Sequence, residues 1–319
     1  MKKILITGGS GFIGSNLINY LIKKNYKICN IDKLSEVSTP EKFKVLINKR
    51  NYKFYKANLL NKNKVKNIFY KFKPDFIINF AAESHVDRSI VDPDTFVRTN
   101  CLGTNVMCDV ARHADIERFL HISTDEVYGS IEEGSFVETD RLGPRSPYSS
   151  SKAGSDLIAL SYQETYDLPV IVTRSSNNFG PYQFPEKVIP LFVTNLLDGK
   201  KVPLYGDGLN VRDWIHVLDN CAGVDTVLRK GTIGEIYNIG GGNETTNREL
   251  TTMVLANMGV GEEMVEYVQD RLGHDRRYSI DCSKANALGW QPSRELDVAI
   301  AETVEWYRAN RSWWEPLKA

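Results

Sequence analysis

The chain has 319 residues and carries 40 basic and 40 acidic side chains, so its formal net charge is zero. Its length suffices for one large or two small domains with an ample core, and its composition, 42% hydrophobic and 25% charged, is that of an ordinary globular protein. Zero net charge argues against a dedicated nucleic-acid binder, and no apolar run approaches the ~20 residues of a membrane span.

Charge is distributed unevenly along the chain. Residues 1–73 hold 17 basic and three acidic side chains, whereas residues 74–319 hold 23 basic and 37 acidic ones. Such asymmetry can mark a basic nucleic-acid-binding half. Most lysines of residues 1–73, however, fall on predicted helices and loops away from the glycine loop GGSGFIG. Lysine side chains on solvated faces therefore explain the charge asymmetry. The switch from Lys to Arg near residue 74 has no physical explanation in the sequence.

No targeting or metal-binding pattern is visible. The apolar run that follows Lys2 and Lys3 is too short for a signal peptide. The five cysteines are scattered without zinc spacing. We therefore expect a cytoplasmic protein with no metal site and no membrane partner.

Six short apolar runs alternate with helix-length segments in the first half of the chain. The runs are 3–7, 27–31, 52–56, 75–80, 118–123 and 169–173, and the segments between them are 13–24, 41–50, 61–72, 94–113 and 148–166. Apolar strands separated by helices are typical of a parallel sheet that is buried on both faces. We predict an α/β fold with a Rossmann-type doubly wound parallel sheet, in which ligands bind at the C-terminal ends of the strands.

The strand–helix rhythm ends near residue 175. Proline and glycine punctuate residues 180–210, after which 235–240 reads as a strand and 247–258 and 295–309 read as helices. We predict a Rossmann domain over 1–175, with returning elements near 213–241, and a smaller, mixed and discontinuous substrate domain over 176–319. Three tryptophans near the C-terminus are expected to anchor the core or the seam between domains: Trp306, Trp313 and Trp314.

The first predicted strand runs directly into the glycine loop GGSGFIG (8–14). Its glycines at 8, 11 and 14 permit a tight turn, close approach of the backbone to a pyrophosphate, and a helix N-terminus directed at negative charge. The second strand is followed by Asp32, 18 residues beyond Gly14. A carboxylate there can accept both ribose hydroxyls of NAD and repels the 2′-phosphate of NADP. Lys33 would suit NADP, but the acid before it favours NAD.

Two further motifs carry chemistry. Tyr148 and Lys152, in YSSSK, share one face of a predicted helix, and an ammonium group beside a phenol lowers its pKa from about 10. Thr124, Asp125 and Glu126, in STDEVYG, follow the fifth strand. One of the two carboxyl groups can act as an acid and the other as a base if their surroundings separate their pKa values. The plain alternative is that these acids only begin a turn or helix.

Taken together, GGSGFIG, Asp32, STDEVYG and YSSSK resemble an extended short-chain dehydrogenase/reductase, and more narrowly the nucleotide-sugar 4,6-dehydratases, typified by dTDP-glucose 4,6-dehydratase. The similarity continues through 81–90, 175–190, 203–220 and 270–281. The acid–acid pair is its specific element, because sister epimerases and decarboxylases typically lack it. The resemblance implies NAD-dependent dehydration of a nucleoside-diphosphate hexose, with dTDP-glucose as the expected substrate and a 4-keto-6-deoxy sugar as the product. A UDP-sugar 4,6-dehydratase, an NDP-sugar epimerase and a non-catalytic NAD-binding regulator are the alternatives.

The resemblance also implies a role for each catalytic residue. Tyr148, assisted by Lys152, takes the proton of the sugar 4-hydroxyl while a hydride leaves C4 for NAD. Glu126 removes the C5 proton, and Asp125 protonates the departing 6-hydroxyl. Thr124 hydrogen-bonds the 4-oxygen, and the hydride then returns to C6.

Binding residues are implied in the same way. The cofactor contacts are Gly8, Gly11, Phe12, Ile13, Gly14, Asp32, Lys33, Ser35, Asn58, Leu59, Phe80, Ala81, Ala82, Ser84, Thr99, Tyr148, Lys152 and Asn178. The substrate contacts are Ser84, Asp87, Thr124, Asn177, Lys187, Val188, Pro203, Tyr205, Arg212, Asn247, Arg271 and His274.

Two stretches depart from the family pattern. Asn58 stands where the family usually has an acid that touches adenine, although asparagine keeps an acceptor oxygen. The residues from Ser35 to Ser38 replace a usual Tyr-Ala-Gly-Asn run, so the family pattern does not predict how the loop around the adenine ribose binds it.

The helices predicted at 94–113 and 148–166 carry apolar stripes on more than one side. They correspond to a helix pair that forms a four-helix dimer interface in the family, so a homodimer is expected.

Overall fold

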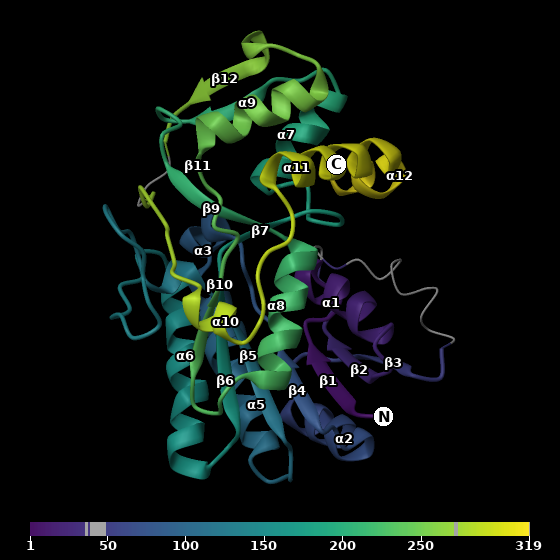
Figure 1. The fold of residues 1–319 in the computed structure, drawn as a ribbon. Helices are drawn as coiled ribbons and strands as arrows, with labels where there is room; N and C mark the ends of the chain where they lie inside the picture. Colours follow the sequence, from purple (N-terminus) through teal and green to yellow (C-terminus); the bar gives the residue numbers. More distant parts are fainter. Residues whose placement is uncertain (36–37, 39–48, 271–273, 319) are drawn as a thin grey trace.

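A seven-stranded parallel sheet forms the centre of the computed structural model, which describes residues 1–35, 38, 49–270 and 274–318 (Figure 1). Its order is β10-β6-β5-β4-β1-β2-β3, so the direction of winding reverses between β1 and β4. This is the predicted Rossmann-type topology. The strands are β1 (Lys3–Thr7), β2 (Lys27–Asp32), β3 (Tyr52–Lys56), β4 (Phe76–Asn79), β5 (Arg118–Thr124), β6 (Val170–Ser175) and β10 (Ile236–Ile239).

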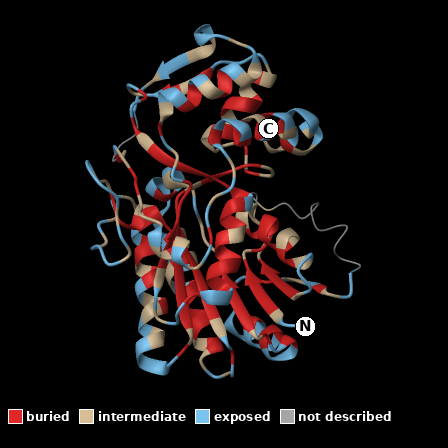
Figure 2. Ribbon diagram, viewed as in Figure 1, coloured by how far each residue is buried: buried red, intermediate tan, exposed pale blue. Residues whose placement is uncertain are grey.

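Side-chain alternation along the strands buries both faces of this sheet. Ile4 and Ile6 pack on one face beneath α1 (Phe12–Ile22) and α8 (Val217–Lys230). Leu5, between them, packs on the other face with α2 (Lys62–Phe72), α5 (Gly103–Ala111) and α6 (Pro147–Tyr166). Figure 2 shows the strands buried and the outer sides of these helices exposed. Burial on two sides explains why apolar runs located the strands to within two residues.

The helix predicted at 94–113 is interrupted. It consists of α4 (Pro93–Phe96), a π-helical segment η2 (Val97–Leu102) and α5, joined end to end. The buried Asn100 in η2 donates to Ser151 Oγ (2.8 Å) and to the Glu83 carbonyl (3.1 Å), and it accepts from Glu83 N–H (2.8 Å). A π turn is a frequent feature of functional sites. The helix predicted at 41–50 lies largely outside the described residues.

Most of the elements after residue 176 build a smaller unit beyond the C-terminal ends of the large sheet's strands (Figure 1). A three-stranded sheet has the order β11 (Glu244–Thr246), β9 (Val211–His216), β7 (Asn177–Phe179), and β8 (Val202–Tyr205) pairs with β12 (Val265–Val268). Helices α7 (Val188–Leu197), α9 (Asn247–Met258), α11 (Leu296–Ala309) and α12 (Arg311–Trp314) share a separate core with them. The predicted helices at 247–258 and 295–309 are α9 and α11.

Two long helices had no counterpart in the sequence prediction. The third residue of α7 is a proline in an otherwise apolar run, and α8 has the polar side chains of Asp219, Asn220 and Asp225 buried among its apolar ones. Each feature obscures the helical period. Helix α8 packs on the large sheet and β10 joins it, whereas β9 belongs to the three-stranded sheet and contributes Ile215 to the core beneath α1 and α8. The remaining short elements are α3 (Val86–Val91), α10 (Ser283–Ala287), η3 (Asp125–Val127), η4 (Glu262–Met264) and η5 (Glu315–Leu317).

The described lysines of the basic N-terminal stretch lie mostly on the surface. On α2, Lys62, Lys64, Lys66 and Lys71 are exposed while Val65 and Phe69 are buried. These positions agree with a solvated lysine face. Within the described residues, no helix combines the length and the apolar character needed to cross a bilayer.

Candidate active site

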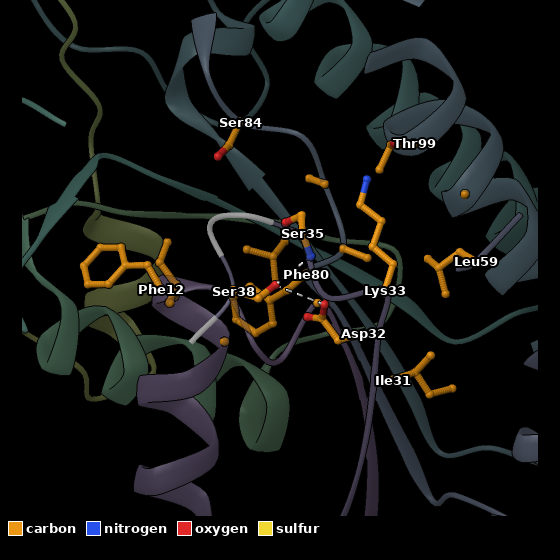
Figure 3. Close-up of a pocket in the computed structure, with 18 of the residues that line it drawn as sticks. Phe12, Ile31, Asp32, Lys33, Ser35, Ser38, Leu59, Phe80, Ser84 and Thr99 are labelled. Carbon is orange, nitrogen blue, oxygen red and sulfur yellow. Dashed lines mark hydrogen bonds between the residues drawn. The ribbon is translucent and has the colours of Figure 1, made fainter. Parts of the chain in front are cut away.

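One pocket opens at the C-terminal ends of β1, β2, β4 and β5, where the strand order reverses (Figure 3). This is the position at which doubly wound sheets bind ligands. Every predicted cofactor contact except Asn178 lines it, and so do the predicted substrate contacts Ser84 and Lys187. The loop after β7 forms another wall, with Gln183, Phe184 and Glu186.

The glycine loop brings backbone rather than side chains to the pocket. Gly8 has φ +67°, and a Cβ atom there would lie 2.6 Å from Ala81 N. A Cβ atom on Gly14 would lie 2.6 Å from Gly8 O. The next residue after Gly11 begins α1, whose N-terminus has no side-chain cap. Its first N–H groups are therefore left to meet an anionic ligand, which fits the pyrophosphate of a dinucleotide.

Asp32 stands at the end of β2 and is buried. One carboxylate oxygen accepts from Ser10 N–H (2.9 Å), and the other accepts from Leu34 N–H (2.8 Å) and from Ser38 Oγ (3.4 Å; Figure 3). Burial raises the pKa of Asp32, and these hydrogen bonds oppose that rise. The Ser38 contact was not predicted, since Ser38 lies in the loop that departs from the family pattern.

Lys33 and Asn58 both have partners within the chain. The Lys33 ammonium lies 2.5 Å from Glu83 Oε1, so its charge is offset by an acid rather than left for a 2′-phosphate. Asn58 lines the pocket, and its Oδ1 accepts from Leu60 N–H at 3.0 Å, which closes the turn that follows β3. A carbonyl oxygen has a second lone pair, so the predicted contact with adenine stays a prediction.

Helix α6 carries Tyr148 and Lys152 into the same pocket. Its N-terminus is capped by Ser146, whose hydroxyl accepts from Ser149 N–H (3.1 Å). Both functional side chains are buried, and Lys152 Nζ donates to the Ile122 carbonyl (2.6 Å). Burial lowers the pKa of Lys152 to about 8.

The expected lowering of the Tyr148 pKa is wrong for this structure. Burial raises the pKa of the phenol, the negative charge of Glu126 raises it further, and a hydrogen bond with Thr124 acts in the opposite direction. The reason is geometric, since the hydrogen bond of Lys152 goes to the Ile122 carbonyl. In this structure the surroundings of Tyr148 therefore favour the protonated phenol.

The two adjacent acids differ in their surroundings. Strand β5 ends at Thr124, whose Oγ1 accepts from Glu126 N–H (3.3 Å) and donates to Asp125 Oδ1 (3.2 Å). Asp125 is 3% exposed, whereas Glu126 is only partly buried. Burial raises the pKa of Asp125 well above its ordinary value, and the charges of Glu126 and Asp213 add to the effect. Burial therefore favours the protonated form of Asp125, beside a second carboxyl group, and this arrangement suits an acid and a base.

Arg212 and Tyr278 face the acid pair from the smaller unit. The Arg212 guanidinium lies 4.1 Å from the centre of the Tyr278 ring and donates to the Asp275 carbonyl (2.8 Å). Its charge lowers the pKa of Asp125, while the charge of Glu126 contributes to raising that of Tyr278. Both residues thus adjoin the acids. Tyr278 was missed although its segment, 270–281, was singled out in the sequence.

Glu186 is a second missed residue. It lines the pocket, and its carboxylate lies 3.0 Å from Arg88 Nη2 and 3.4 Å from His85 Nε2. Its neighbour Lys187, which was predicted, donates to the Ser84 carbonyl (3.1 Å). No spacing rule distinguishes Glu186 from a surface acid, so only the fold reveals it.

The other predicted binding residues lie outside this pocket, and their roles stay predictions. Asn178 is buried in β7 and accepts at its carbonyl from Gln183 Nε2 (2.8 Å). Arg271 lies outside the described residues. The remaining positions are Asn177 in β7, Asp87 in α3, Val188 at the start of α7, Pro203 and Tyr205 in β8, Asn247 at the start of α9, and His274, which bonds Asp270 (2.6 Å). The described residues contain no cluster of His, Cys, Asp or Glu side chains able to hold a metal ion.

Comparisons with known proteins agree with this geometry. The family described as GDP-mannose 4,6 dehydratase matches residues 5–303. A dTDP-glucose 4,6-dehydratase of Streptomyces antibioticus is 51% identical and covers 99% of this chain and 95% of its own. The crystal structure of DesIV, a dTDP-glucose 4,6-dehydratase from Streptomyces venezuelae with NAD and TYD bound, has a TM-score of 0.96 at 46% identity and covers 99% of both chains. A UDP-glucose 4-epimerase of Thermotoga maritima, solved with UDP-glucose, has a TM-score of 0.90 at 30% identity and covers 97% of this chain and 99% of its own.

Proposed function

The chain belongs to the GDP-mannose 4,6 dehydratase family, and we propose that with bound NAD it converts dTDP-glucose into dTDP-4-keto-6-deoxyglucose and water. The observation that carries this proposal is the enclosed Asp125 carboxyl group beside the partly buried Glu126, close to Tyr148. An epimerase needs no acid to expel a hydroxyl group. The similarity to dTDP-glucose 4,6-dehydratases, at 46–51% identity, also exceeds that to the UDP-glucose 4-epimerase at 30%.

The residues of the pocket fit NAD. The glycine loop can approach a pyrophosphate closely, Asp32 can accept ribose hydroxyls, and Lys33 is paired with Glu83. When bound, NAD supplies a hydride acceptor that later returns the hydride, and its oxidised ring brings positive charge to the pocket. That positive charge favours the phenolate of Tyr148. Removal of the 4-hydroxyl proton is thereby linked to the presence of the oxidised cofactor.

The elimination step uses the acid pair. Glu126 accepts the C5 proton, which the 4-ketone has made acidic, and the electron pair of the broken C–H bond forms the C5–C6 double bond. The C6–O bond breaks, and Asp125 transfers its proton to the departing oxygen, so water leaves. Burial raises the pKa of Asp125 and so favours the form that carries this proton. Thr124 hydrogen-bonds Tyr148 and is placed to contact the 4-oxygen as well.

Incubation with dTDP-glucose in deuterated water tests the proposal. NMR should show a 4-keto-6-deoxy product that carries deuterium at C5, and UDP-glucose should react more slowly. A hydrophobic contact of one methyl group discriminates by only about 1–3 kcal/mol. Recovery of a C4 epimer, or of unchanged substrate from protein that holds NAD, contradicts the proposal.

A matched variant assigns the base in the same experiment. Glu126→Gln keeps the shape of the side chain but cannot accept a proton, so it should give no product while the NAD content of the protein is unchanged. Loss of NAD from this variant would assign Glu126 a structural role instead.

We also propose that the chain forms a homodimer through η2 and α6. These two elements pack against each other, and they expose apolar side chains, with Val97 52%, Leu102 46% and Leu157 60% exposed. Exposed apolar side chains gathered on adjacent helices are a sign of an interface. A second copy of the same two helices would complete the expected four-helix bundle.

The division into a cofactor part (1–175, with returning elements near 213–241) and a discontinuous substrate part (176–319) is proposed on packing. The core shared by α7, α9 and α11 is separate from the two cores that flank the large sheet. The cytoplasmic location stays a prediction.

A further inference from the structure

The loop between β7 and α7, residues 180–187, forms a wall of the cofactor pocket. Gln183, Phe184, Glu186 and Lys187 all line the pocket. The loop has little secondary structure of its own, with turn hydrogen bonds from Gln183 N–H to Gly180 O (3.3 Å) and from Lys187 N–H to Phe184 O (3.1 Å). Other parts of the molecule must therefore hold its position.

Two side chains from distant elements bind two carbonyl groups of this loop, one on each side of Tyr182. Asn16, in the helix that follows the glycine loop, donates from Nδ2 to Pro181 O (3.0 Å). Tyr307, in α11, donates from its hydroxyl group to Gln183 O. Between these carbonyls, Tyr182 has φ +68°, a left-handed conformation that is rare and costly for a residue with a side chain. A strained conformation of this kind persists only where its surroundings impose it.

The tryptophan-rich C-terminal segment holds Tyr307 and Tyr182 in place. Tyr307 is fully buried, and its carbonyl accepts from Trp314 Nε1 (2.7 Å). Trp306 and Trp313 pack on the Tyr182 ring, with ring centres 4.6 and 5.3 Å from it. Only Trp314 is fully buried among the three tryptophans expected to serve as anchors. The other two pack on Tyr182, in the loop whose following residues line the cofactor pocket.

We infer that Tyr307 is a positioning residue for the cofactor, and that the segment from Trp306 to Trp314 holds the pocket loop against bound NAD and so slows its release. The inference rests on the proposed function, which names NAD as the ligand. Tyr307 does not touch the ligand; it acts through the backbone of Gln183.

The release rate of NAD from the holoenzyme, measured without sugar, tests the inference. Tyr307→Phe removes one hydroxyl group and leaves the Gln183 carbonyl buried without that donor, so we expect release to be about tenfold faster. Tyr237→Phe is the matched control, because the Tyr237 hydroxyl is also buried and accepts from a backbone group, Thr232 N–H (2.9 Å), far along the chain from the pocket loop. The control should lose thermal stability to a similar extent but release NAD at the rate of the unchanged protein.

Asn16→Ala loosens the same loop from the opposite side and keeps the inference testable if Tyr307→Phe folds poorly. It should also accelerate release, and the double variant should fall short of the product of the two single effects, because both side chains act on one loop. Release from Tyr307→Phe at the rate of the control would overturn the inference while leaving the proposed function intact. If the unchanged protein retains no NAD, both are overturned.

Discussion

At the scale of single residues, Asp125 and Glu126 show how the surroundings of two adjacent carboxyl groups can give them different roles. Both carry a carboxyl group on the turn after β5, yet one is enclosed and the other is only partly buried. The enclosed group also faces Asp213, a second buried acid. Desolvation and like charge both favour the protonated form. The sequence indicates that the pair exists, but only the packing decides which acid keeps its proton.

Asp125→Asn should make the fold more stable at pH 8 while it abolishes dehydration. Because the folded-state pKa of Asp125 is raised, the folded protein holds a proton that the unfolded chain releases above about pH 4. The contribution of Asp125 to stability is therefore complete at low pH and is lost as the pH rises toward the folded-state pKa. An amide does not titrate, so the gain from the substitution should grow with pH.

Thermal unfolding at pH 5 and pH 8 measures this gain. At pH 8 we expect Tm to rise by about 2–4 °C, the shift that corresponds to roughly 1 kcal/mol in a chain of this size class. Glu132→Gln, at an exposed position, serves as the control, and it should change Tm by the same amount at both pH values. A variant less stable than the unchanged protein at pH 8 would show that the Asp125 carboxyl group stabilises the fold.

Lys152 should give the reaction an alkaline limit. Its pKa is lowered by burial to about 8, so the ammonium loses its proton as the pH rises through that value, and the pocket then loses one of its positive charges. The positive ring of NAD can only move this limit to lower pH. Above the limit, we expect kcat/KM of the unchanged protein to fall about tenfold per pH unit. The guanidinium of Lys152→Arg stays charged, so kcat/KM of this variant should show no such fall below pH 10. An unchanged limit in that variant would assign the titration to another group.

At the scale of elements, the glycine loop is the feature that the sequence specifies most directly. Gly14 and Gly103 both lie in helices that border the pocket, but their surroundings differ. A Cβ atom on Gly14 would lie 2.6 Å from Gly8 O and 2.8 Å from Gly9 Cα, whereas one on Gly103 would lie 3.6 Å from its nearest neighbour, a methyl carbon of Leu59.

Gly14→Ala should therefore displace the loop backbone and abolish NAD retention, while Gly103→Ala should retain NAD. The second variant should also gain up to about 1 kcal/mol, because alanine favours a helix over glycine. NAD content after gel filtration and Tm from calorimetry measure the two effects. Equal retention of NAD by both variants would mean that the close approach at Gly14 is not what shapes the pyrophosphate site.

Elements differ in how far the sequence alone could predict them. The strands of the large sheet were found because burial on two faces makes them continuously apolar, and α9 and α11 because their apolar period is regular. The π turn at Val97–Leu102 was not foreseeable, because it depends on contacts of Asn100 with Glu83 and Ser151 from other parts of the chain. Glu186 and Tyr278 were missed for the same reason, since each is defined by a partner remote in sequence, whereas Ser38 lies close to Asp32 in the loop that departs from the family pattern.

At the scale of the whole molecule, the site draws on both compositional halves of the chain. The lysine-rich first 73 residues supply the glycine loop and Asp32, and the acidic remainder supplies the acid pair, Tyr148 and Lys152. The C-terminal segment adds a third contribution by holding the loop at 180–187. A pocket assembled from three separate stretches explains why the zero net charge of the chain says little about its function.

The proposed dimer predicts that charged substitutions on η2 and α6 weaken the association of two chains. Val97 and Leu157 are exposed on η2 and α6, and in a symmetric dimer each substitution changes the interface twice. Val97→Glu and Leu157→Glu each replace an apolar contact at the interface by a negative charge. That charge either lies near the same glutamate of the second subunit or must be desolvated, and either costs several kcal/mol of the free energy of association. Sedimentation velocity at micromolar concentration should show a dimer for the unchanged chain and a dissociation constant at least about 100-fold higher for either variant. Val298→Glu places the same charge on α11, at a valine that is 55% exposed, and should leave the dimer intact. Dissociation by Val298→Glu, with no effect of the other two, would move the interface to the C-terminal helices and contradict the four-helix arrangement.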